Sequence, residues 1–74
     1  HVNTTDSAVQ LRFDVANSPN LPDAVKRRLG ALAGRRMTAE GVLILRSEGS
    51  RSQALNRQEV RERLFEMIRA ATIV

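Results

Sequence analysis

The chain has 74 residues, a formal net charge of +4 and no cysteine. This length allows one small domain with a thin core, and the lack of cysteine excludes disulfides and thiolate zinc sites and fits a reducing compartment. The longest aliphatic run covers residues 42–45, far fewer than the roughly 20 residues of a membrane span, so a soluble intracellular protein is expected.

The excess of positive charge lies in one segment, residues 22–36. Outside it, seven arginines balance seven acidic residues, and inside it five cations accompany a single aspartate. The five cations are Lys26, Arg27, Arg28, Arg35 and Arg36. Such a cluster suits a polyanion such as RNA, but small domains also carry charge on ordinary solvated faces, and both interpretations stay open at this point.

The first part of the chain predicts a strand followed by a helix. Apolar and polar residues alternate over residues 9–15, which is the period of a half-buried strand. After a loop, Pro22 suits the first turn of a helix, which is expected over about residues 22–34 and ends at Gly34. The apolar stripe of this helix is Val25, Leu29 and Leu32.

A second strand is expected at residues 41–45, with the sequence GVLIL. Four consecutive aliphatic residues predict a strand covered on both faces, and such a central strand needs neighbours on both edges. Two strands seldom make an independent sheet. We therefore expect at least one further strand before residue 1 in the natural protein.

The last element is a helix predicted over about residues 57–71. Asn56 has the residue type of an N-cap, Glu59 stands where it could complete a capping box, and Leu55 could pack as a staple onto Val60. The apolar stripe is Val60, Leu64, Met67, Ile68 and Ala71. The order strand, helix, strand, helix predicts an α+β fold in two layers, here a β-α-β-α fragment.

The side chains of this segment offer little support for catalysis. The single histidine is His1 and there is no cysteine, so a transition-metal site lacks its usual ligands. The serines have no imidazole base other than His1. We therefore expect no metal and no cofactor, and no catalytic residue is assigned within the chain.

Two segments resemble the class I peptide chain release factors. HVNTTDSAV, residues 1–9, is similar to the segment that follows their Gly-Gly-Gln motif, and RSQALNR, residues 51–57, is similar to the segment that closes the same domain. The intervening LRFDVANSPNLPDAVKRRL and GVLILRSEGSRSQ resemble the codon-independent ribosome-rescue peptidyl-tRNA hydrolases, which carry a helix where codon-reading factors have a short hairpin. Thr4 departs from the lysine frequent in rescue hydrolases and agrees with the codon-reading factors.

The resemblance implies that residues 1–74 form a release-factor-type catalytic domain without its N-terminal strand and Gly-Gly-Gln loop, which is expected immediately before His1. It implies that the full-length protein hydrolyses the peptidyl-tRNA ester in stalled ribosomes, while this segment alone is inactive. The residues expected to anchor the catalytic loop are His1, Val2, Asn3, Thr4 and Thr5. The residues expected to contact RNA are Lys26, Arg27, Arg28, Arg35, Arg36 and Arg51.

The implied partners are the ribosome, ribosomal RNA and peptidyl-tRNA, and the protein is expected to be a monomer. The implied location is the bacterial cytoplasm in association with ribosomes, with a mitochondrial location left open. Rescue hydrolases carry a basic tail after this domain, whereas the sequence ends at ATIV. Two alternatives remain: a non-catalytic ribosome- or RNA-binding module, and a fragment of a codon-reading class I release factor.

Overall fold

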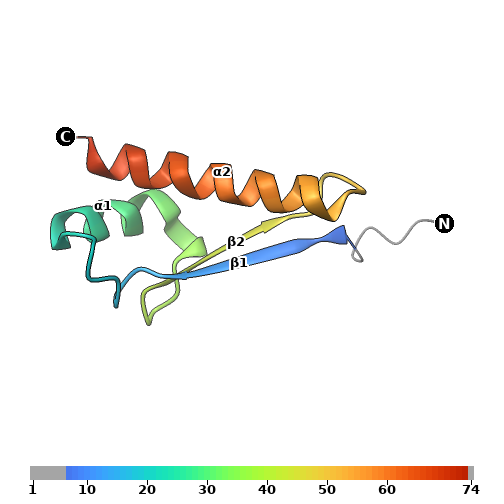
Figure 1. The fold of residues 1–74 in the computed structure, drawn as a ribbon. Helices are drawn as coiled ribbons and strands as arrows, with labels where there is room; N and C mark the ends of the chain where they lie inside the picture. Colours follow the sequence, from blue (N-terminus) through green and yellow to red (C-terminus); the bar gives the residue numbers. More distant parts are fainter. Residues whose placement is uncertain (1–6, 74) are drawn as a thin grey trace.

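The computed structural model describes residues 7–73, which form a two-stranded antiparallel sheet packed against helices (Figure 1). The elements in chain order are β1 (Val9–Asp14), α1 (Asp23–Ala33), the short 3₁₀-helix η2 (Gly34–Arg36), β2 (Val42–Ser47) and α2 (Gln53–Thr72). Helix α2 spans the molecule, with its N-terminal part over the sheet and its C-terminal part beside α1 (Figure 1). The predicted α+β class and the order of elements are confirmed.

The sheet has one well-covered face. Phe13 lies opposite Leu43 in the β1–β2 register, and this row faces the core. Leu43 and Leu45 are fully buried, whereas the alternate residues Val42 and Ile44 are half-buried. The expectation that β2 is covered on both faces was therefore wrong for residues 7–73, because the helices pack against only one side of this sheet.

The two edges of the sheet differ. The first edge is the side of β2 that faces away from β1. At the start of β2 this edge is occupied by Met37, which forms an isolated bridge with Leu43. There the Thr38 amide donates to the Val42 carbonyl at 2.8 Å, and the Thr38 hydroxyl accepts from the Val42 amide at 3.0 Å. Among residues 7–73, β1 has β2 as its single partner strand, so β1 forms an edge of the sheet.

Helix α1 buries one narrow stripe. Val25, Leu29 and Ala33 are spaced by four residues and are buried. Leu32, expected in this stripe, is 51% exposed, because a spacing of four keeps Ala33 on the buried face and turns Leu32 away from it. Gly34 ends the helix as expected, with a φ of 57° and its amide donating to the Gly30 carbonyl.

Helix α2 begins earlier than predicted. It starts at Gln53, and its N-cap is Ser52, whose hydroxyl accepts a hydrogen bond from the Leu55 amide at 3.2 Å. The predicted cap at Asn56 and the predicted Leu55 staple were wrong, since Asn56 lies inside the helix and Leu55 is 57% exposed. The predicted apolar stripe is confirmed: Val60 and Ala71 are buried, and the remaining members pack against the core.

Candidate functional site

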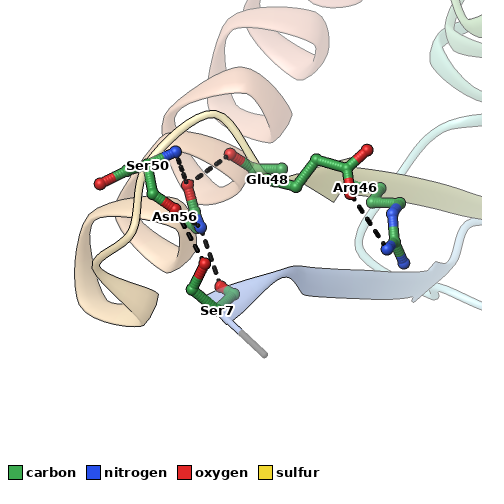
Figure 2. A network of polar contacts seen from close by, with 6 residues as sticks. Ser7, Arg46, Glu48, Ser50 and Asn56 are labelled. Carbon is green, nitrogen blue, oxygen red and sulfur yellow. Dashed lines mark hydrogen bonds and ion pairs between the residues drawn. The ribbon is translucent and has the colours of Figure 1, made fainter. Parts of the chain in front are cut away.

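A buried polar network centres on the side chain of Asn56 (Figure 2). Its Oδ1 accepts hydrogen bonds from the Ser50 amide at 3.0 Å and from the Ser47 hydroxyl at 3.2 Å. Its Nδ2 donates to the carbonyls of Ser7 at 2.8 Å and Ser50 at 2.9 Å. Asn56 is 1% exposed, so these four bonds replace all the water contacts that burial removes from the amide.

The network joins the start of β1, which is distant in sequence, to the end of β2 and the loop before α2. Ser7 precedes β1, Ser47 ends β2, and Ser50 lies in the loop that leads to α2. The Ser7 hydroxyl adds a further bond to the Ser50 carbonyl at 2.9 Å. Because buried amides are costly to leave unpaired, the four side-chain bonds of Asn56 hold these segments at fixed positions relative to α2.

Sequence reasoning attributed Asn56 to helix capping and missed this role. Asparagine followed by Glu59 matches a capping box, but Ser52 is an equally suitable cap four residues earlier. The missed signal was the serine-rich loop of residues 47–52 directly before the helix, since a buried asparagine needs partners of this kind.

An exposed ion pair lies beside the network and is drawn in Figure 2. Arg46 and Glu48 approach to 3.3 Å, and about half of each side chain is exposed. Exposed pairs of this kind add little stability. The loop between β2 and α2 is therefore held mainly by the buried amide of Asn56.

The predicted anchor residues of the catalytic loop lie outside the described residues. These are His1, Val2, Asn3, Thr4 and Thr5, and the first described residue is Ser7. Ser7 is 8% exposed and its carbonyl is bound by Asn56. The described structure thus includes the point from which the chain continues toward the predicted anchor.

The predicted RNA-binding cations on α1 and η2 divide into two groups. The Lys26 ammonium donates to the Ala16 carbonyl at 2.9 Å, and the Arg28 Nε donates to the Ala71 carbonyl at 2.6 Å. These two side chains therefore hold a loop and the end of α2 in place. The exposed cations of the segment are Arg27, Arg35 and Arg36.

Arg51 is not part of the same cluster. It is exposed in the loop before α2, whereas α1 lies beside the opposite end of that helix (Figure 1).

A shallow groove of about 340 Å³ borders the α1 cations. Its lining includes the apolar Val15, Ala16 and Met37 and the charged Asp23, Lys26 and Arg27, so apolar surface and charges of both signs meet there.

Neither a metal cluster nor a membrane-spanning helix is present in the described part of the chain. Residues 7–73 contain no group of three histidine, cysteine, aspartate or glutamate side chains placed to hold a metal ion. No helix within the same range combines the length and the apolar character required to cross a membrane.

Comparison with known proteins gives an informative similarity. No family model matches the chain. Peptidyl-tRNA hydrolase ArfB of Pseudomonas putida is 46% identical over 71 residues, which are 96% of this chain and 51% of that protein. The chain is thus similar to a peptidyl-tRNA hydrolase. It spans about half the length of this curated relative, and the similarity supports the resemblance predicted from residues 1–9 and 51–57.

Proposed function

We propose that the whole protein hydrolyses the ester between a nascent peptide and tRNA in stalled ribosomes, and that residues 1–74 belong to its catalytic domain. The observation that carries this proposal is the 46% identity to a peptidyl-tRNA hydrolase across nearly the entire chain. The geometry is consistent with a supporting role. The described residues form a folded scaffold, in which Asn56 holds Ser7, the first described residue, through a hydrogen bond to its carbonyl.

The proposed chemistry is positional. By resemblance, a Gly-Gly-Gln motif immediately before His1 places the attacking water with its glutamine, and a backbone amide of the motif stabilises the developing oxyanion. No metal or cofactor takes part in this scheme. The residues of this chain then serve to hold the loop in place, with His1, Val2, Asn3, Thr4 and Thr5 as its anchor.

The edge position of β1 supports a further strand in the complete domain. Val9, Leu11 and Phe13 face the core but are only half-buried, although Leu43 and Leu45 across from two of them are fully buried. A strand on the outer edge of β1 would cover these side chains and satisfy the outward backbone groups. We assign this position to the strand expected before the Gly-Gly-Gln loop.

Exposed cations supply the proposed contacts with ribosomal RNA. Arg27, Arg35 and Arg36 lie in the continuous segment formed by α1 and η2. Arg51 directly follows Ser50, whose carbonyl is bonded to Ser7. Arginine is well suited to phosphate because its guanidinium group can donate two parallel hydrogen bonds. The partners proposed for the whole protein are the ribosome, its RNA and peptidyl-tRNA, with the protein acting as a monomer in the bacterial cytoplasm.

The proposal is tested with the full-length protein and purified ribosomes stalled with labelled peptidyl-tRNA. The wild-type protein should release the peptide from tRNA, and alanine at the glutamine of the Gly-Gly-Gln motif should reduce the release rate by orders of magnitude, because that group places the water. Ribosome binding by the variant serves as the control. Unchanged release by this variant would refute the mechanism.

A non-catalytic RNA-binding module is the second candidate, favoured by the three exposed arginines of α1 and η2. The same assay separates the two functions. Such a module would bind ribosomes in a salt-dependent manner and leave the peptidyl-tRNA ester intact. Codon-reading activity, the remaining alternative, would make peptide release depend on a stop codon in the ribosomal A site.

A further inference from the structure

The side chain of Asn56 forms a hydrogen bond with the backbone of Ser7, the first residue that the structure describes. Its Nδ2 donates to the Ser7 carbonyl at 2.8 Å, a bond between residues 49 positions apart in sequence. The carbonyl is a backbone group, so this contact depends on where the chain runs at Ser7 and not on the identity of that side chain. The Asn56 amide thus fixes the position of the main chain at the start of β1.

The remaining bonds of Asn56 make this contact rigid. Oδ1 is held by the Ser50 amide and the Ser47 hydroxyl, and the second hydrogen of Nδ2 binds the Ser50 carbonyl. Flipping the amide would exchange its donors and acceptor and break these bonds. With full burial and every hydrogen-bonding position used, the side chain has one orientation, and Nδ2 points at Ser7.

We propose that Asn56 is a positioning residue for peptidyl-tRNA hydrolysis, because it fixes the main chain at Ser7, from which the chain continues toward the proposed catalytic loop. This inference rests on the proposed function. The physical reason is that only residues 1–6 separate Ser7 from the proposed position of the Gly-Gly-Gln motif, so the site at which the main chain is held at Ser7 is close in sequence to the reacting groups. Displacements of about 1 Å can cost about 100-fold in rate.

The deciding variant is Asn56→Asp in the full-length protein. Aspartate has the same size but cannot donate when ionised. The carbonyls of Ser7 and Ser50 then lose the hydrogen bonds from Nδ2 and face a negative charge instead. We expect kcat for peptide release to fall about 10- to 100-fold, while KM for the stalled ribosome changes by less than about threefold. Asn56→Ser is the second variant, because its shorter side chain lacks Nδ2 and both of its hydrogens and introduces no charge.

The matched control is Val60→Ala. Val60 lies one turn further along α2 and is also fully buried, so its truncation weakens the domain through packing. Thermal unfolding would establish that all variants are folded at the assay temperature. We expect Val60→Ala to keep kcat within about twofold of wild type, so loss of stability by itself is separated from loss of positioning.

Amide hydrogen exchange provides a readout that does not require activity. In the Asn56 variants, the amides of residues 7–9 and of the loop 48–52 should exchange faster than in Val60→Ala, because local opening is no longer resisted by the buried amide. Equal exchange and equal kcat in the Asn56 variants and Val60→Ala, with an active wild type, would overturn this inference alone. An inactive wild type would overturn the proposed function and this inference with it.

Discussion

Gly41 combines two constraints at one residue. Its φ is 86°, a conformation that other residues rarely adopt, and a Cβ placed there would lie 2.5 Å from the Ala16 Cβ. The approach is close because the Gly41 carbonyl accepts hydrogen bonds from the amides of Val15 and Ala16 at 3.0 and 3.1 Å. The turn before β2 is therefore tied to the chain that leaves β1.

Gly41→Ala should lower the free energy of unfolding by about 2–4 kcal/mol, from backbone strain and steric overlap together. Denaturant unfolding measures the change. The double variant Gly41→Ala with Ala16→Gly removes the Cβ overlap but leaves the strained φ. Its loss of stability should therefore be smaller than the sum of the losses in the two single variants. Wild-type stability in Gly41→Ala would contradict the structure of this turn.

The carboxylate of Asp14 lies at the end of β1. Asp14 accepts hydrogen bonds from Asn17, at 2.9 Å from the side-chain Nδ2 and 3.2 Å from the backbone amide. These bonds favour the ionised form and lower the pKa of Asp14 below its ordinary value of 3.8, with a smaller contribution from the positive charge of Lys26. The carboxylate therefore contributes stability above about pH 4, which is lost as the pH falls through the lowered pKa.

Asn17→Ala should raise the pKa of Asp14 toward its ordinary value, because the stronger of the two hydrogen-bond effects is removed while the backbone bond remains. Nuclear magnetic resonance titration of the Asp14 carboxyl carbon measures this directly. Asn20→Ala, a change at an exposed position in the same loop, is the control. An Asp14 pKa that is the same in both variants would exclude Asn17 as the cause.

The sequence predicted local features of individual residues better than their long-range partners. Gly34 as the end of a helix follows from local backbone preference. Asn56 was assigned to the wrong role, because its partners Ser7 and Ser47 are 49 and nine positions away. Local patterns carry no information about which distant backbone carbonyl a buried amide will meet.

At the scale of elements, the strands and helices were found in order, and the errors concerned their ends and faces. Helix α2 begins four residues before the predicted position because two suitable caps stand close together. The aliphatic run of β2 resembled a strand buried on both sides, yet Val42 and Ile44 are half-buried on the face away from the helices. An aliphatic run shows that residues are apolar, but which face is covered depends on how the helices pack.

Helix α1 carries a glycine that its structure does not require. Gly30 lies in the interior of the helix, and a Cβ added there would have no heavy atom within 4 Å apart from its chain neighbours and the nearby backbone of the same helix. Gly30→Ala should therefore raise the free energy of unfolding by about 0.5–1 kcal/mol, through the higher helix propensity of alanine. Thermal or denaturant unfolding tests this, with Gly41→Ala as the opposite case. A loss of stability would show that the space beside Gly30 is filled.

At the scale of the whole molecule, α2 separates two regions with different proposed roles. Asn56 and Ala71 are both bonded to other segments, and at 1.5 Å per residue they lie about 22 Å apart along the helix axis. Ser7 is bonded to the first of these residues and Arg28 to the second, and α1 lies beside the C-terminal part of α2 (Figure 1). Binding and catalysis should therefore be separable by substitution.

Replacing the three exposed arginines of α1 and η2 by glutamine should weaken ribosome binding and flatten its dependence on salt. The slope of log K against log salt is negative. For each phosphate that is no longer neutralised, the magnitude of this slope should decrease by about 0.7–0.9. The substitutions are Arg27→Gln, Arg35→Gln and Arg36→Gln.

The matched control replaces three exposed arginines of α2, Arg57, Arg61 and Arg69, by glutamine. Both variants lose three positive charges, so they change the long-range attraction to RNA by a similar amount. If the α1–η2 arginines form a local phosphate site, the magnitude of the salt slope should decrease more in the α1–η2 variant than in the control. The release rate at saturating protein should stay near wild type in both variants. Equal slopes in the two variants would show that RNA attraction depends on total charge, and the segment 22–36 would then be an ordinary solvated face.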